Sequence, residues 1–487
     1  MPKTLADAFD PRANSIGFLR WLMAFMVIFS HAGPIGGFYG GKDLGTQLSD
    51  EQSLGGVAVA GFFFFSGFLI TQSRMGRSST LRYFWRRGLR IFPAWWLSLL
   101  IVAFVFGPIG WMQETGGIGG YFSATEDSPL TYFFNNMWLV LGQHNIAGMG
   151  SELPFATIHG GYDWNGSAWT LMYEFRAYIL VGVLGLFGVF AHKWLAGTIA
   201  GVIILLSSMQ WAYVGDLTHV LPAFQNIYNL LFLGPFAFGM LFALFGKRIP
   251  MDDRLAIGAL VVAVATYNVG GWLAYGQYAF LYFLMWIAIR ATKLQHWEKF
   301  GDFSYGIYIF AWPVMTLGAF FGLQNAGWIT YHVVVIVACH VLAFFSWHLI
   351  EKPAMSLKNW TPKPLAWLLL KWSPISLSLK RRFTNPVYSS TRFAAQLRLA
   401  EASETPAPVA PPAGSSAPSE SPVLVASSHA PPGESSRPSA PVPPRVRTAE
   451  STESTFTASP VRTADRDELS TDGEPPVRTR DSSEAKS

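Results

Sequence analysis

The sequence predicts an all-α polytopic membrane protein of about ten transmembrane helices, because apolar stretches of the length that a bilayer demands recur along it. The composition agrees: of 487 residues 51% are hydrophobic and only 13% are charged, whereas a soluble domain carries about 25% charged residues to cover its surface. Basic residues also gather in alternate connecting segments, as they do in the cytoplasmic loops of membrane proteins. A disordered cytoplasmic tail is expected to follow the membrane part.

Ten stretches are expected to cross the membrane, and each is apolar over most of its length. They are 15–35, 57–72, 94–111, 169–191, 194–214, 230–245, 255–269, 272–289, 305–322 and 331–350. The loop after the second stretch carries six arginines and no acid, and it should lie in the cytoplasm, whereas 112–166 has acids but no Lys or Arg and should lie outside. The chain is therefore expected to begin and end on the cytoplasmic side.

Four regions follow from these patterns. Residues 1–14 are expected to be a cytoplasmic N-terminus without a removable signal peptide, so that the first span acts as its own insertion signal. Residues 15–358 form the membrane domain, and 359–400 form a basic segment that is expected to lie along the membrane interface. Residues 401–487 are rich in Pro and Ser and poor in aromatic residues, so they cannot bury enough apolar surface to offset their ordering entropy and should be disordered.

Arg20 and His31 are expected to lie on one face of the first span. They are eleven positions apart, which is close to three whole turns and about 16 Å along the axis. A charge in hydrocarbon costs about 2.5–3.5 kcal/mol even on the lenient insertion scales, so an intramembrane arginine needs a function. An imidazole can accept a proton from an attacking hydroxyl, and a guanidinium suits a phosphate or a carboxylate. The pairing favours a functional site over a histidine that only bonds a neighbouring backbone group.

The basic segment after the second span has two interpretations. Its charges can serve membrane orientation and attraction to anionic lipids alone. However, Arg86, Arg87 and Arg90 are denser than orientation requires, and Arg86 and Arg90 would face the same way on a helix. Such a pair of guanidinium groups at the inner surface suits a phosphorylated cofactor.

Three further observations concern the spans. Glu174 lies two positions before Arg176, so on a helix the two side chains point in different directions. Glu174 is therefore expected to have a partner on another helix, near the level of His31. The alternative is that it belongs to a purely structural ion pair between helices. Ser66 and Gly67 are typical of close helix packing, and no Gly-x-Ser-x-Gly elbow surrounds Ser66. The single cysteine and the absence of any metal-binding histidine spacing in the sequence predict that no metal is bound.

Together these motifs resemble the membrane acyltransferase-3 family, the integral membrane O-acyltransferases of bacterial envelope glycans. The resemblance is carried by Arg20 and His31 as an Arg-x10-His signature, by 62–71 (FFFFSGFLIT), by 86–93 (RRGLRIFP), and by 169–174, 304–314 and 347–355 in that order. It spans about 16–357, the whole membrane part. One position departs: Ala311 stands where many relatives have a histidine, so His31 is expected to act without it.

The resemblance implies transfer of an acyl group, most often acetyl, from cytoplasmic acyl-CoA to a hydroxyl of an extracytoplasmic glycan or glycolipid, in a bacterial cytoplasmic membrane. His31 would be the catalytic residue and Arg20 its essential partner, and Glu174 would line the site. We further expect Glu174 to orient the His31 ring. Arg86, Arg87 and Arg90 would hold the CoA phosphates, with Ser66 lining the site. The partners would be acyl-CoA, the acceptor and membrane lipids, with no nucleic acid.

One alternative from another class is a transporter that moves a phosphorylated or acidic solute or lipid past Arg20. Polytopic form and an intramembrane charge suit both. Transporters often contain paired repeats with broken helices, and no such repeat is visible in the sequence.

Overall fold

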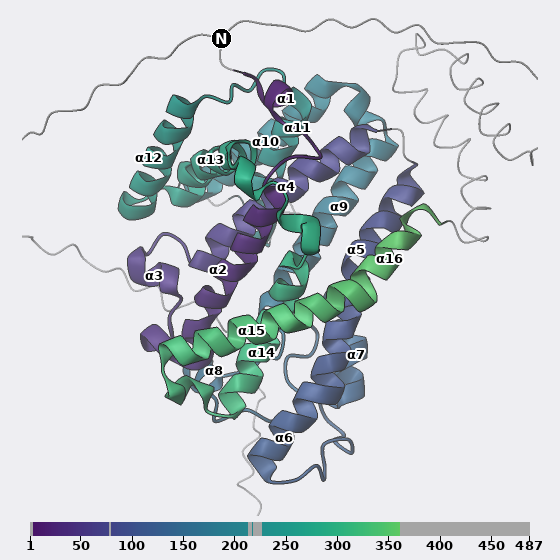
Figure 1. Ribbon diagram of the computed structural model, residues 1–487, viewed down its shortest axis with the longest axis vertical. Helices are drawn as coiled ribbons and strands as arrows, with labels where there is room; N and C mark the ends of the chain where they lie inside the picture. The colour runs from purple at the N-terminus through teal and green to yellow at the C-terminus, as the bar shows by residue number, and fades with distance from the viewer. Residues whose placement is uncertain (1–2, 77–78, 213–216, 218–225, 361–487) are drawn as a thin grey trace, which may run out of the picture. The chain divides into compact units, whose positions relative to one another are not determined.

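The regular structure is helical throughout residues 3–76, 79–212, 217 and 226–360, which are the residues that the computed structural model describes (Figure 1). The expected interfacial segment beyond residue 360 and the expected disordered tail lie outside these ranges. Within them, eight helical runs are long and apolar enough to cross a membrane. These are α2 (Ile16–Gly36), α4 (Leu54–Met75), Thr80–Thr115, Gly166–Leu186, α10 (Lys193–Trp211), α11 (Tyr228–Phe245), Trp272–Arg290 and Trp328–Asn359.

Several of these runs contain more than one helix. Thr80–Thr115 joins α5 (Thr80–Ile101) through a π-helical turn to α6 (Gly107–Thr115); the later runs contain α9 (Thr170–Leu186), α13 (Gln277–Arg290), α15 (Trp328–Ser346) and α16 (Lys352–Ser356). The short helix α1 (Leu5–Ala8) precedes them, and three others lie between them: α3 (Leu44–Leu48), α7 (Pro129–Asn136) and α8 (Pro154–His159). The other two expected spans are α12 (Asp253–Val269) and α14 (Ser304–Phe320), with 17 residues each. The all-α, multi-span fold class is therefore confirmed.

The structure corrects one boundary that matters for the site. Arg82 to Arg90 do not form a loop before an expected span at 94–111, because α5 begins at Thr80. Ser79 caps this helix, since its hydroxyl accepts a hydrogen bond from the Arg82 N–H. Arginine is a good helix former, so the basic stretch continues the apolar helix as its first turns.

The helix α14 is the centre of the bundle. Its residues from Ser304 to Thr316 are all buried, which is the pattern of a helix surrounded by others. It packs against α2 and α15, and Figure 1 shows α15 crossing it obliquely while α16 continues towards α5. The side chains that α2 directs towards α14 therefore face a helix that is buried along this whole stretch.

A pair of glycines brings α4 and α11 into close contact. A Cβ atom at Gly67 would lie 2.0 Å from the carbonyl oxygen of Phe236, and one at Gly239 would lie 2.1 Å from that of Phe64. Small residues allow this backbone approach within a membrane. The expectation that Gly67 serves close packing is confirmed.

The connecting segments gather in two groups. The N-terminal segment bonds the 249–251 turn through the Leu5 and Met251 N–H groups, and the Ser15 N–H bonds the Ala288 carbonyl. In the other group, Glu51 accepts hydrogen bonds from the Gly271 and Trp272 N–H groups. Successive connecting segments therefore belong alternately to the two groups, as is expected when each helix crosses the membrane once. The side of the membrane on which each group lies stays a prediction from the charges.

Candidate active site

Arg20 and His31 both face the segment around α14. The Arg20 guanidinium lies 2.9 Å from an Asp302 carboxylate oxygen, just before α14 begins. The His31 ring packs edge-on against Trp312 within α14, with 4.8 Å between ring centroids. The eleven-residue spacing thus places the two side chains on one side of α2, as predicted.

His31 lines a cavity of about 250 Å³, here called the histidine cavity. Its walls come from α2, the first turns of α4, the turn before α9, α11 and α13; they include Gln52, Ser53, Gly55, Gly56, Ser167, Trp169, Tyr228, Phe232 and Gln277. Throughout the described part of the chain, no group forms a hydrogen bond with either ring nitrogen of His31. The imidazole therefore faces open space with its hydrogen-bonding capacity unused.

A smaller cavity of about 40 Å³, here called the arginine cavity, is lined by Arg20, Glu174, Ser304 and Tyr305 among others. Val59, Thr170 and Tyr308 line both cavities. Between them, the Thr170 and Tyr308 hydroxyls form a hydrogen bond of 2.5 Å. The two cavities therefore meet at this contact, one near each end of the Arg20–His31 face.

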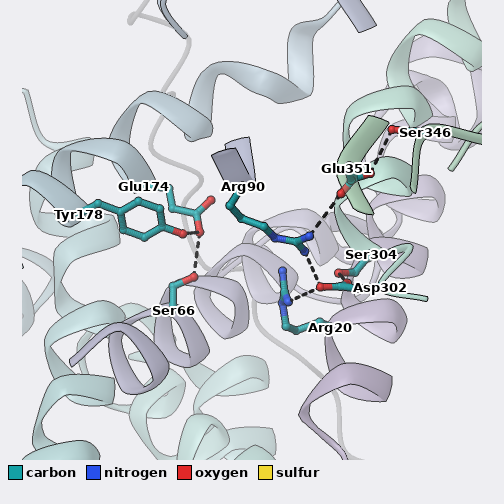
Figure 2. Close-up of polar contacts among 9 residues, drawn as sticks. All are labelled: Arg20, Ser66, Arg90, Glu174, Tyr178, Asp302, Ser304, Ser346 and Glu351. Atoms are coloured by element: carbon teal, nitrogen blue, oxygen red, sulfur yellow. Dashed lines mark hydrogen bonds and ion pairs between the residues drawn. The ribbon is translucent and has the colours of Figure 1, made fainter. Parts of the chain in front are cut away.

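Four charged side chains form a network beside the arginine cavity (Figure 2). Asp302 is paired with both Arg20 and Arg90, and Arg90 also lies 3.3 Å from Glu351. Burial alone would raise the pKa of Asp302, but the charges of Arg20 and Arg90 outweigh it and hold that pKa below its ordinary value. Two cations thus meet two acidic side chains, with Asp302 as the shared partner.

Glu174 lies at the level of Arg20 and not of His31. Its carboxylate accepts hydrogen bonds from Ser66, at 2.8 Å, and from Tyr178 (Figure 2). The expectation of a partner on another helix holds, since Ser66 is in α4, but the expected position beside the His31 ring is wrong. The reason is its register: Glu174 is one turn beyond Thr170, which already marks the boundary between the cavities.

The three arginines predicted to bind CoA, Arg86, Arg87 and Arg90 of α5, do not form a single anion-binding site. Arg86 and Arg90 do face the same way, towards the end of the chain's last span, where Arg86 reaches Asn359 at 3.0 Å and Arg90 reaches Glu351. Arg87 lies instead over the Tyr178 ring, 5.9 Å from its centroid. Arg90 is already paired with two acidic side chains, so a CoA phosphate would have to compete with them for its guanidinium. That these arginines hold the CoA phosphates stays a prediction.

Two acidic residues of the network, Asp302 and Glu351, were not among the site residues predicted from the sequence. They lie 282 and 261 positions from Arg20 and Arg90, their respective partners. A signal was available, because both stand inside or beside motifs of the resemblance, at 304–314 and 347–355. An intramembrane arginine needs an acidic partner, and these acids were the candidates.

The chain is a multi-pass membrane acyltransferase. It belongs to the acyltransferase-3 family, whose model, an acyltransferase domain, matches residues 14–350. This confirms the resemblance and favours the enzyme over the transporter.

Three relatives are each 27% identical to the chain. An O-acetyl transferase of Shigella phage Sf6 matches over 348 residues, 70% of this chain and 96% of the relative, and nodulation protein 10 of Rhizobium leguminosarum bv. viciae matches over 371 residues, 71% and 94%. The acyltransferase MdmB of Streptomyces mycarofaciens matches over 168 residues, 34% and 38%. No solved structure matches the chain.

Proposed function

We propose that this membrane O-acyltransferase moves an acetyl group from cytoplasmic acetyl-CoA to a hydroxyl of an extracytoplasmic glycan or glycolipid, in a bacterial cytoplasmic membrane. The similarity to a protein named O-acetyl transferase supports the acetyl group. The basic first turns of α5 support an anionic donor headgroup on the inner side.

The observation that carries the proposal is the pair of cavities along one face of α2. Arg20 lines one and His31 the other, and both cavities reach Val59, Thr170 and Tyr308. In the proposal, Arg86 and Arg87 bind the CoA phosphates, and the pantetheine arm passes the arginine cavity. The pantetheine arm then places the thioester in the histidine cavity, once the hydrogen bond between Thr170 and Tyr308 breaks.

His31 is proposed as the general base. It takes the proton of the acceptor hydroxyl as that oxygen attacks the acyl carbon. Arg20, held by Asp302, orients the donor through its remaining N–H groups. Glu174 is assigned to the donor end of the path, where it lines the arginine cavity and is held by Ser66. Acyl transfer through an acyl-His31 intermediate and direct transfer both fit this arrangement.

The test uses membrane vesicles that contain the full chain, given acetyl-CoA labelled in its acetyl group, with label in the glycan and lipid fractions as the readout. His31→Ala should abolish labelling. His348→Ala is the matched control, because His348 is a half-buried histidine of a spanning run that lines neither cavity. Normal labelling by His31→Ala would refute the proposed function. Comparing glycan and lipid masses between a deletion strain and its parent identifies the acceptor.

A further inference from the structure

The wall of the histidine cavity contains a buried hydroxyl that lacks a hydrogen-bond partner in the described part of the chain. Ser167 is one of the lining residues and is only 3% exposed. Its Oγ has no hydrogen-bond partner among the residues that the structure describes. A buried polar group without a partner costs about 1–3 kcal/mol, so its retention calls for an explanation.

The first turn of α4, in the wall of the same cavity, leaves one N–H group unused. Three of its amides are bonded: Leu54 N–H to Asp43, Gly56 N–H to the Ser53 hydroxyl, and Val57 N–H to the Ser53 carbonyl. In the described ranges the N–H of Gly55 has no partner. Because α4 has 22 residues, this N–H stands at the positive end of a long helix dipole.

Both residues line the same cavity as His31, and Gly55 lies next to its ring. A Cβ atom at Gly55 would lie 2.6 Å from the Ser30 hydroxyl and 4.0 Å from Cε1 of the His31 ring, so only glycine fits this approach. On the other side, Gly166 packs on the Trp312 indole, with 2.5 Å from an added Cβ to the ring, and the same indole contacts His31. The backbone at Ser167 is fixed, since the Tyr308 hydroxyl donates to the Ser167 carbonyl at 2.6 Å.

We propose that the Ser167 hydroxyl and the Gly55 N–H form the oxyanion hole of the acyl transfer, with the carbonyl oxygen of the transferred acyl group as their ligand. This rests on the proposed function. As the acceptor oxygen bonds to the acyl carbon, His31 takes the hydroxyl proton and the carbonyl electron pair moves onto oxygen. The two donors bind that oxyanion. When the carbonyl re-forms, the carbon–sulfur bond breaks and the CoA thiolate leaves, taking up the proton from His31.

The arrangement explains why these donors stay unpaired. Donors that stabilise a developing charge work best when they are fixed in advance and are not engaged by other protein groups. The hydroxyl and the N–H come from two separate elements, and each element is tied down by its own hydrogen bonds, Tyr308 for one and the Ser53 cap for the other.

The test is Ser167→Ala in the full chain, assayed in vesicles with labelled acetyl-CoA. We expect kcat to fall about 10²–10³-fold, as on loss of one oxyanion-hole donor, with KM for acetyl-CoA unchanged within about twofold. Because alanine removes an unsatisfied buried hydroxyl, the melting temperature should stay equal or rise. The matched control is Ser207→Ala, which changes a buried serine of α10 outside the cavity and should leave kcat unaltered.

Three results would overturn the proposal. They are a normal kcat for Ser167→Ala, a change in KM alone, and an activity loss that is matched by a fall in melting temperature or by Ser207→Ala. In any of these cases an inactive His31→Ala still supports the proposed function. An active His31→Ala refutes that function independently of Ser167.

Discussion

The two cavities along α2 differ in how their polar groups are satisfied. Around the arginine cavity Arg20, Arg90, Asp302 and Glu351 bind one another. Around the histidine cavity the His31 ring and the Ser167 hydroxyl are unpartnered within the described residues. Ion pairs fix the positions of the side chains that form them, whereas fixed donors and acceptors without a protein partner are available to bind a ligand. In the proposed function, this difference separates a positioning centre around the arginine cavity from a reacting centre around the histidine cavity.

The largest loss of stability is expected from Asp302→Asn, which breaks the positioning centre. It leaves two guanidinium groups without their shared carboxylate, and removal of one partner from a buried pair costs about 3–5 kcal/mol. Displacement of Arg20 by about 1 Å should lower the acyl transfer rate about 100-fold. Thermal unfolding and the labelled acetyl assay measure the two effects.

The control for this change is Asp253→Asn. Asp253 is paired with Arg290 at the surface, where the two side chains are 60% and 51% exposed, so the loss should stay below about 1 kcal/mol. Equal losses of stability from the two substitutions would show that the buried network contributes no more than a surface ion pair.

A second, smaller effect should come from Gly67→Ala, which disturbs packing without touching a polar group of either cavity. The new Cβ would lie 2.0 Å from the Phe236 carbonyl oxygen, and overpacking of this kind costs about 1–3 kcal/mol. The melting temperature should fall while the activity of the folded enzyme stays within a few-fold. Gly201→Ala, where an added Cβ meets nothing within 4 Å, should be neutral or slightly stabilising. A large loss of kcat in folded Gly67→Ala would mean that activity follows general packing.

Tyr308→Phe addresses the boundary between the two centres. It removes the hydroxyl that holds the Ser167 carbonyl and contacts Thr170, and the orphaned carbonyl should cost about 1–3 kcal/mol. If Ser167 must be held in place, kcat should fall about tenfold and KM should change less. Tyr305→Phe is the comparison on the same helix, because it loses a bond to the Ile91 carbonyl and leaves Ser167 held. Equal kcat values for the two variants would contradict a positioning role for Tyr308.

The part of this site that could be predicted is the part that depends on one helix. The common face of Arg20 and His31 follows from helical periodicity alone, and the family follows from short motifs. The start of α5 was predicted too late, because its first turns are basic and a search for apolar stretches excludes them. The level of Glu174 and the pairing of Arg90 depend on which helices pack together, and their partners are far away in sequence. That Ser167 has no partner is a property of its surroundings, and residue type cannot indicate it.

The smallest effect is on the pH dependence of stability. The surface pair of His144 and Asp163 should lose its contribution as the pH rises, whereas the buried ion pairs of Asp302 should lose theirs as the pH falls. The hydrogen bond to Asp163 raises the pKa of His144 above its ordinary 6.5, although partial burial opposes it. The pair therefore stabilises the fold fully below pH 6.5, and this contribution is lost as the pH rises through the raised pKa. Since the His144 side chain is 58% exposed, the gain is at most about 1 kcal/mol.

Melting temperatures of the wild type and His144→Gln, compared from pH 5 to pH 9, measure this contribution. The difference between them should be largest at the acid end and close as the pH rises. For Asp302 the folded pKa lies below the ordinary 3.8, so its contribution is complete above that value and is lost only in stronger acid. A difference between the wild type and His144→Gln that did not shrink between pH 5 and pH 9 would contradict a stabilising His144–Asp163 pair.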